Sequence, residues 1–560
     1  MYIFKNLHKK HLLLIAVWFV INVLQSIFTG LHSDESYYWM YAQHLDWGFF
    51  DHPPMVALLI NMGYSLFQNE LGVRLFIIIL SSISIAIIVN EINEQKDFFF
   101  LCLFVLSFPL IHTHIGGFLA LPDIPLIFFT LLFFILYREF TEKPGLNISL
   151  LLSVVIAAMV YSKYHAVLIV FFTVLSNLKL LRNRYFWLIV VVSLLLLSPH
   201  IWWQYQNDFP TLRYHLFERA KSFRLKYILL YIAGQLAIAG PLTGVIVFWK
   251  LRKFRAKNIF DRAVIFNILG FYTVFFILSS YNRIEAHWTA AIIPLLMIAS
   301  YPLISNDSVS KKWFKRLSLP VIILFFLFRV YLAVDAIPDV GHLKITFYKR
   351  GDSAREIQQM AKGKKVGFFD NYAATSNYIF YTGEQAVLLS NPGYRFCQYD
   401  LWDDEAYAEG DSLFIVIPKR MNPPAPVRLC NGQMIGFMAI GGFQSLKGLM
   451  PVIKGIGKDG GFLKIIIQLR NNSSRSIQLR RPSSPSIGWK QGAAEVGAVL
   501  LSDLIRQGII IPGGCVSIKL NIPLKGIDTG KPLVIYTRTS ENNRGEIITV
   551  PPKMLSDRQR

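Results

Sequence analysis

Long apolar runs fill the first 336 residues of this chain and restrict that part to a membrane fold. An apolar run of about 20 residues is long enough to cross a bilayer as a helix. We count eleven such runs, at roughly 11–30, 71–90, 98–112, 122–137, 147–162, 163–178, 185–203, 227–249, 263–281, 288–303 and 317–336. The run 53–67, which Pro53-Pro54 opens, is shorter and is predicted to be a re-entrant or interfacial helix. The pattern predicts an all-α polytopic membrane domain over residues 1–336, with about 11–13 transmembrane helices.

The positive charges of the loops predict the orientation of this domain. With the N-terminus inside, the inner loops carry nineteen Lys and Arg and the outer loops carry six. Such a bias is typical of cytoplasmic loops. The chain is therefore expected in the cytoplasmic (inner) membrane, with a cytoplasmic N-terminus and everything after residue 336 on the extracytoplasmic side. The basic start followed by the run from His11 to Phe28 favours an uncleaved first helix over a signal peptide.

Composition changes near residue 337 and indicates a different kind of structure. Short apolar segments such as Lys364–Phe369 and Ser412–Ile417 are typical of strands, and 373–381 is typical of a helix. We predict a small α/β domain over 337–425 that ends at the Pro-rich stretch 422–426. Residues 426–560 are predicted to form a β-rich region of unknown role.

Charge and cysteine content narrow the classes of function. The net charge of +22 is explained first by cytoplasmic loops and anionic lipid, and no nucleic-acid motif accompanies it. The cysteines, Cys102, Cys397, Cys430 and Cys515, show no zinc-ligand spacing. Pairing of Cys397 with Cys430 in an oxidising space stays open.

The segment from His32 to Pro54, between two apolar runs, is the most unusual polar stretch. It holds four acidic residues, three histidines and many aromatic residues, with no Lys or Arg. Acidic pairs beside aromatic rings suit a site where a proton is removed and a sugar is bound. An interfacial amphipathic helix is the alternative interpretation. The predicted orientation places this segment on the outer side, together with other polar groups at helix ends, namely Asp123, Lys163 to His165, the loop 204–226, and Arg283 to His287.

An ordered set of motifs resembles bacterial polyprenyl-phosphate-sugar glycosyltransferases. These are membrane GT-C enzymes related to protein O-mannosyltransferases and to the lipid A aminoarabinose transferase. The similarity covers about residues 10–405 and does not extend to the tail from about 430. The motifs are 34–39, 43–48, 51–54, 72–74, 121–126, 162–164, 198–200 with Trp203 and 207–209, 234–235, 285–288, 378–383 and 395–402.

The resemblance implies a reaction. A sugar would move from a polyprenyl (undecaprenyl) phosphate carrier to a hydroxyl of a lipid, glycan or protein at the outer face, with inversion and without a metal. Asp34 is predicted to be the general base, and helix capping is the alternative role for it. Glu35 and Asp123 are predicted as further acidic catalytic residues, with orientation of the site open for Glu35 and capping open for Asp123.

Further residues are predicted to bind the donor phosphate or the sugar. In the aminoarabinose branch, the residue before the Pro-Pro pair is a Lys, whereas this chain has His52, which disfavours that particular reaction. For Lys163, the alternative is that its side chain snorkels to the membrane interface. For the basic stretch that begins at Arg213, the alternative is contact with anionic lipid headgroups. For Arg283, the alternative is simple pairing with Glu285. The predicted binding residues are Asp51, His52, Lys163, Tyr164, His165, Arg213, Arg283 and His287.

No cofactor is expected, and a divalent metal at the histidines and acids of the first outer loop is the less favoured alternative. The expected partners are the polyprenyl-phosphate sugar donor, membrane lipids and the acceptor, without nucleic acid. A polyprenyl-linked lipid transporter or flippase is the rival function. Such a transporter would be expected to carry charges near the middle of several helices, whereas the unusual polar residues here lie at the ends of the apolar runs.

Overall fold

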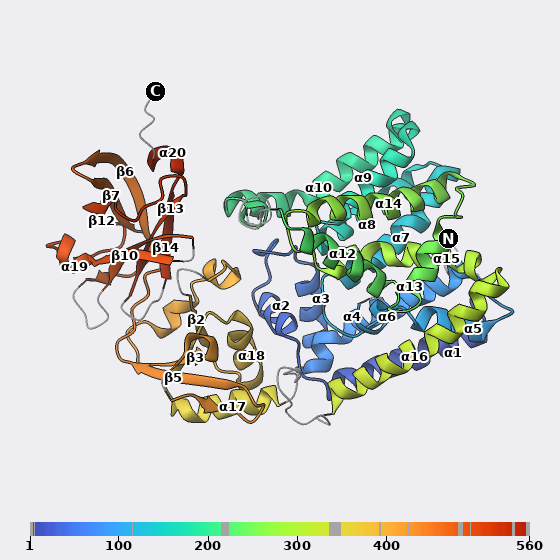
Figure 1. Ribbon diagram of the computed structural model, residues 1–560, viewed down its shortest axis with the longest axis horizontal. Coiled ribbons are helices and arrows are strands. Elements are labelled where there is room, and N and C mark those ends of the chain that lie inside the picture. Colours follow the sequence, from blue (N-terminus) through green and yellow to red (C-terminus); the bar gives the residue numbers. More distant parts are fainter. Residues whose placement is uncertain are drawn as a thin grey trace. The chain divides into compact units, whose positions relative to one another are not determined.

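The chain forms two compact units, Met1–Tyr348 and Lys349–Arg560, each described by itself below (Figure 1). The structure is a computed structural model. It describes residues 4, 6–114, 116–213, 223–334, 349–390, 394–423, 425–479, 485–492, 494–539 and 544–555.

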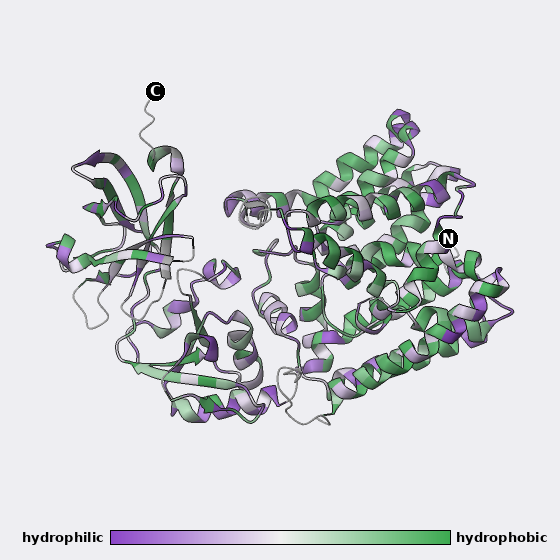
Figure 2. Cartoon of the chain, viewed as in Figure 1, coloured by the Kyte–Doolittle hydropathy of each residue, from purple (hydrophilic) through white to green (hydrophobic). Residues whose placement is uncertain are grey.

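The first unit is helical throughout its described residues, and most of its helices are coloured as hydrophobic in Figure 2. Among the described residues, seven helices are long and apolar enough to cross a membrane, and four shorter apolar helices accompany them. The α-helices are α1 Lys9–Phe28, α2 Ser33–Gln43, α3 Met55–Tyr64, α4 Glu70–Ile92, α5 Phe98–Leu106, α6 Pro109–Thr113, α7 Asp123–Glu142, α8 Leu146–Ser162, α9 Ala166–Ser176, α10 Arg184–Gln206, α11 Pro210–Arg213, α12 Leu225–Ile238, α13 Gly244–Leu251, α14 Ile259–Ser279, α15 Ile293–Ser305 and α16 Ser308–Ala333. The described residues of this unit also form two 3₁₀-helices, Leu178–Arg182 and Ala286–Ile292.

Two apolar runs that were expected to be single helices are broken. The run 98–112 divides into α5 and α6 because Pro109, which cannot donate a backbone hydrogen bond, begins a new helix. The run 227–249 divides into α12 and α13 at Gly240, whose φ of 119° lies outside the helical region. Hydropathy alone hides both breaks, because the interrupting residues are themselves apolar or small.

A tight helical hairpin supports the segment from His32 to Pro54, which we call the first outer segment after its predicted side of the membrane. The predicted run 53–67 forms α3, which at 10 residues is too short to cross a bilayer, and it packs against α4. A Cβ on Gly72 would lie 1.7 Å from the carbonyl oxygen of Phe67, and one on Gly63 would lie 2.2 Å from the carbonyl oxygen of Gly72. Only glycine permits such close backbone approach, so these two residues set the position of Arg74 at the start of α4.

The second unit begins with a five-stranded mixed sheet of order β2-β1-β3-β5-β4. The parallel strands β1, β2 and β3 agree with the predicted strands to within a residue, and antiparallel β5 extends the sheet. The elements are α17 Arg350–Ala361, β1 Lys365–Phe369, α18 Tyr372–Thr382, β2 Ala386–Leu389, β3 Leu413–Pro418, β4 Val427–Arg428 and β5 Met434–Ile440, with short 3₁₀-helices at Gln398–Asp400, Asp404–Ala408 and Lys419–Met421.

The predicted boundary at residue 425 falls inside this sheet and needs correction. Strands β4 and β5 follow that residue and pair with each other, and β5 pairs with β3. Instead of forming a linker, the Pro-rich stretch packs onto the sheet: a Cβ on Gly436 would lie 2.1 Å from Cβ of Pro423. Proline signals a chain break in sequence, but here it supports an edge of the sheet.

The remaining residues form a β-sandwich. A three-stranded sheet of order β12-β7-β6 faces a four-stranded sheet of order β10-β9-β13-β14, and one buried apolar cluster includes side chains of both. The elements are β6 Leu449–Asp459, β7 Phe462–Asn471, β8 Ile477–Gln478, β9 Ser486–Gln491, β10 Ala494–Leu500, α19 Leu501–Leu504, β11 Ile509–Ile510, β12 Cys515–Pro523, β13 Leu533–Arg538, β14 Arg544–Val550 and α20 Pro552–Leu555. Cys397, in the α/β part, is buried and Cys430 is exposed, and both are free thiols.

Candidate active site

The first turn of α2 organises the polar residues of the first outer segment. His32 is the N-cap: its Nδ1 accepts a hydrogen bond from the backbone N–H of Asp34 at 3.2 Å. Glu35 reaches back and accepts from the backbone N–H of His32 at 2.7 Å, which completes a capping box. The capping acceptors are therefore His32 and Glu35, and capping does not account for the carboxylate of Asp34.

Glu35 and Arg74 form a buried ion pair in which both side chains are fully buried. Nε and Nη2 of Arg74 donate to the two carboxylate oxygens at 2.8 and 2.6 Å, and the backbone N–H of Ala120 adds a bond of 2.8 Å. Burial alone would raise the pKa of Glu35, but the Arg74 guanidinium and the backbone donors lower it below its usual value. A carboxylate held in this way suits positioning of the site better than proton transfer.

Asp34 lies one residue earlier and in different surroundings. Its side chain is 41% exposed, and its carboxylate lies 3.7 Å from Nδ1 of His32. A general base must be able to reach the proton that it removes. Of the two neighbouring acids on α2, Asp34 is the accessible one.

Asp123 and Lys163 meet because α7 and α8 form an antiparallel hairpin. Asp123 is the first residue of α7 and Lys163 follows the last residue of α8, so both lie at the same end of the pair. Nζ of Lys163 donates to Oδ1 of Asp123 at 2.8 Å, and the side chains are 7% and 5% exposed. Each charge also lies at the helix end that favours it, an anion at an N-terminus and a cation at a C-terminus.

His52 lies near both Asp34 and the Asp123–Lys163 pair and so connects them into one polar cluster. Its ring lies within electrostatic reach of Asp34, Asp51, Asp123 and Lys163. Burial lowers its pKa below the ordinary value, which favours a neutral ring at neutral pH. The residues predicted from the first outer segment and from the ends of α7 and α8 are therefore close together.

Two further histidines border the Asp123–Lys163 pair. The rings of His114 and His287 stack with centroids 5.4 Å apart, and His114 lies within electrostatic reach of Asp123 and Lys163. His287 was predicted, whereas His114 was missed. An ionisable residue at the end of an apolar run was the signal that identified the other positions, and it applied equally to His114.

Asp51 is positioned by an aromatic neighbour on α2. The hydroxyl of Tyr41 donates to Oδ1 of Asp51 at 2.6 Å, and the Tyr41 ring stacks on Phe49 with centroids 4.1 Å apart. These contacts hold the loop after α2 against the helix.

Tyr164 and His165, next to Lys163, contact other groups. The Tyr164 hydroxyl accepts from Nε2 of Gln204 at 2.8 Å and lies 3.0 Å from Nε2 of His200. The His165 ring packs against Phe275, 5.2 Å between centroids. Of the three consecutive polar residues, Lys163 is the one that pairs with Asp123.

A second set of polar contacts ties the first outer segment to α10. Nε1 of Trp203 donates to Asp46 at 2.7 Å, and Nδ1 of His200 lies 2.6 Å from the carbonyl oxygen of Trp47. A Cβ on Gly48 would lie 2.4 Å from the Trp203 ring, so this approach requires glycine. Sequence reasoning did not assign these residues a role.

Arg283 and Arg213, which were also predicted to bind the donor, are not among the described residues of this polar cluster. Arg283 is 70% exposed and pairs with Glu285 at 3.3 Å, which agrees with the alternative of simple pairing. Arg213 is the last residue of α11, and its side chain lies outside the described residues, as do residues 214–222. Among the described residues, no group of three or more His, Cys, Asp or Glu is arranged to hold a metal ion.

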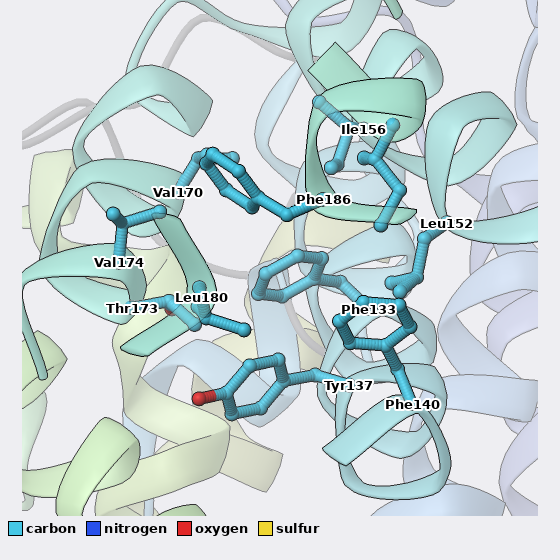
Figure 3. Close-up of a pocket in the computed structure, with 11 residues that line it drawn as sticks. Phe133, Tyr137, Phe140, Leu152, Ile156, Val170, Thr173, Val174, Leu180 and Phe186 are labelled. Carbon is cyan, nitrogen blue, oxygen red and sulfur yellow. The ribbon is translucent and has the colours of Figure 1, made fainter. Parts of the chain in front are cut away.

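An apolar pocket lies elsewhere in the same unit (Figure 3). Helices α7 to α10 and the 3₁₀-helix after α9 line it with side chains such as Phe133, Tyr137 and Phe186, none of them charged. At 1.5 Å per residue, Phe133 is about 15 Å further along α7 than Asp123. The pocket is thus separate from the polar cluster.

Comparisons with known proteins show which solved fold this chain resembles. The family model for dolichyl-phosphate-mannose-protein mannosyltransferase matches residues 51–203, a segment that contains Asp51, His52, Asp123 and Lys163. The structure of ArnT from Cupriavidus metallidurans in the apo state aligns with a TM-score of 0.55 and 14% identity, over 76% of this chain and 97% of that one. The resemblance seen in the sequence is therefore confirmed at the level of the fold: this is a multi-spanning membrane protein that shares its fold with ArnT.

Two particular relatives illustrate the similarity. ArnT from Cupriavidus metallidurans bound to undecaprenyl phosphate aligns with a TM-score of 0.56 and 14% identity, with the same coverage. The lipid A galacturonosyltransferase RgtD of Rhizobium johnstonii is 22% identical over 252 residues, which is 41% of this chain and 51% of that protein. The chain thus spans about half the length of this curated relative.

Proposed function

We propose that this protein is a membrane glycosyltransferase that moves a sugar from a polyprenyl phosphate, such as undecaprenyl phosphate, to a hydroxyl group. The acceptor would be a lipid, glycan or protein at the outer face of the cytoplasmic membrane. The observation that carries the proposal is the position of one accessible carboxylate, Asp34, near the buried Asp123–Lys163 pair and His52. The ArnT structure with undecaprenyl phosphate and the mannosyltransferase family match support this choice of donor.

The proposed reaction is a single displacement. The carboxylate of Asp34 takes the proton of the acceptor hydroxyl as the acceptor oxygen bonds to the anomeric carbon of the sugar. The bond from that carbon to the phosphate oxygen breaks, and the lipid phosphate leaves with the electron pair. Attack opposite to the leaving group inverts the anomeric configuration. A positioned base contributes about 10²–10⁴-fold to such a step.

The leaving phosphate gains negative charge and requires hydrogen-bond donors. Lys163 has three N–H donors, and one of them is used by Asp123, so its Nζ can donate to phosphate while it stays paired. His52 can add a neutral donor. In this scheme Asp123 keeps the ammonium of Lys163 in place, and the Glu35–Arg74 pair keeps α2 and Asp34 in place.

Transfer of a radiolabelled sugar tests the proposal. Membranes that contain the protein would be supplied with labelled polyprenyl-phosphate sugars, and label would be counted in lipid, glycan and protein fractions. Asp34→Asn is expected to reduce transfer by at least about 100-fold. Asp352→Asn is the matched control, because Asp352 is also an exposed acid in the first turn of a helix. Transfer that survives in Asp34→Asn would exclude Asp34 as the base, and movement of intact donor across the bilayer without transfer would support the rival transporter.

A further inference from the structure

The last part of the chain, which includes the β-sandwich, carries a large share of the positive charge of the chain. Residues 426–560 contain 19 Lys and Arg against 7 Asp and Glu, a difference of 12 out of the total net charge of +22. Cytoplasmic loops explain the charges of the first unit, but they do not explain these. A basic region of this size points to an anionic partner.

Part of this charge lies on the outward face of the three-stranded sheet of β6, β7 and β12. Strands β7 and β12 alternate strictly: Ile465 and Ile518 face the buried cluster, whereas Lys464, Ile466 and Lys519 face outward and are exposed. Ile466 and Lys519 are direct partners across the strands. We call this surface the basic face and define it by Val452, Phe462, Lys464, Ile466, Arg470 and Lys519.

The basic face combines cations with exposed apolar side chains. Phe462 and Ile466 are each 42% exposed and Val452 is 37% exposed. The acidic residue at its edge, Asp459, pairs with Lys464 across the β6–β7 turn. Lysines on strands often protect a sheet edge from pairing with another chain. That role does not explain a face that carries several cations together with exposed apolar side chains.

We propose that the basic face docks on the surface of an anionic membrane. Lys and Arg attract acidic headgroups, and apolar side chains enter the headgroup boundary beside them. The first unit holds the chain in a membrane, so a lipid surface is present at high effective concentration. A glycan is the less favoured partner, because sugars pack on aromatic rings and Phe462 is the one aromatic residue in the described strands of this sheet.

The test uses the full chain in nanodiscs of neutral lipid, so that the disc itself offers no anionic surface. Flotation with added vesicles measures binding to phosphatidylglycerol vesicles and to phosphatidylcholine vesicles. We expect binding to the anionic vesicles alone and a decrease with rising salt. Each basic residue near an anionic leaflet contributes about fivefold, so Arg470→Glu with Lys519→Glu should weaken binding by at least about 25-fold.

Lys362→Glu with Lys364→Glu is the control, since it makes the same charge change at exposed positions of the α/β part. If charge reversal prevents folding, Arg470→Gln with Lys519→Gln and the salt titration of the unaltered protein test the same point. Equal binding to neutral and anionic vesicles, or unchanged binding of the charge-reversed protein, would overturn the proposal. Binding to soluble polygalacturonate but not to anionic vesicles would assign the face to a glycan instead.

Discussion

At the scale of single residues, adjacent carboxylates in α2 have opposite environments. Glu35 accepts hydrogen bonds from Arg74 and backbone groups in a fully buried position, whereas the Asp34 side chain is 41% exposed. Neighbouring residues of a helix point about 100° apart, so one side chain can be buried while the next is partly exposed. This contrast is the basis for assigning positioning to Glu35 and proton transfer to Asp34.

Breaking the buried pair should destabilise the protein strongly. Glu35→Gln leaves the Arg74 charge buried without a counter-charge, which typically costs about 3–5 kcal/mol. Thermal unfolding of the detergent-purified protein should show a clearly lower Tm. Glu285→Gln removes an exposed partner of Arg283 and should change stability by less than about 1 kcal/mol. Equal Tm values for the two variants would show that Glu35 does not stabilise α2.

Two half-buried histidines outside the membrane spans should make stability depend on pH. Burial lowers the pKa of His52, and it lowers the pKa of His114 to about 3, whereas an unfolded histidine titrates near about 6.5. Below that pH the unfolded chain binds more protons than the folded chain, so stability falls as the pH decreases from about 6.5.

The expected loss at pH 5 is about 2 kcal/mol for each histidine that stays neutral in the folded protein. Tm measured at pH 7.5 and at pH 5 should differ less in His114→Asn than in the unaltered protein. An identical pH dependence in both proteins would mean that His114 titrates normally in the folded state.

At the scale of elements, helix ends and strand faces determine which side chains meet. Asp123 and Lys163 are 40 positions apart but lie at the same end of the α7–α8 hairpin. In strand β7, successive side chains point to opposite faces of the sheet. Alternate residues therefore belong to the buried cluster and to the basic face.

Neighbouring isoleucines of β7 provide a matched pair of substitutions. Ile465→Ala should cost about 2–5 kcal/mol, because Ile465 is buried in the core of the sandwich. Ile466→Ala should change stability by no more than about 0.5 kcal/mol, because its side chain is exposed. Denaturation followed by tryptophan fluorescence, with Trp489 in the same core, would report both. Similar losses would contradict the assigned register of β7.

Many of the membrane helices, and the common position of Asp123 and Lys163, could be predicted from the sequence. Apolar runs show where membrane helices lie, and helix ends show where Asp123 and Lys163 lie, because neighbouring antiparallel helices share an end. The Glu35–Arg74 pair could not be predicted, since Arg74 lies inside an apolar helix and its partner is 39 residues away. Strand β6 was missed because glycines and lysines interrupt its apolar pattern.

The three consecutive polar residues that follow α8 have different neighbours. Lys163, Tyr164 and His165 were all assigned to donor binding, yet their side chains contact Asp123, Gln204 and Phe275 respectively. A chain that leaves a helix directs successive side chains to different sides.

At the scale of the whole molecule, the charge bias predicts an orientation that can be measured directly. The N-terminus should be cytoplasmic, and the second unit should lie on the outer side. Alkaline phosphatase, which is active only outside the cytoplasm, should be active when fused after Arg560. A fusion after Lys257, in a loop rich in Lys and Arg, should be inactive. The reverse pattern would place the polar cluster on the cytoplasmic side and exclude the proposed location of the reaction.

The account rests on the claim that Asp34, His52, Asp123 and Lys163 serve one site for a lipid-linked sugar. The most direct measurement is a cryo-electron microscopy map of the protein in nanodiscs with added undecaprenyl phosphate. We predict phosphate density within hydrogen-bonding distance of Nζ of Lys163, with Asp34 and His52 around the same space. Phosphate bound away from Lys163, or a map that separates these four side chains, would contradict the account.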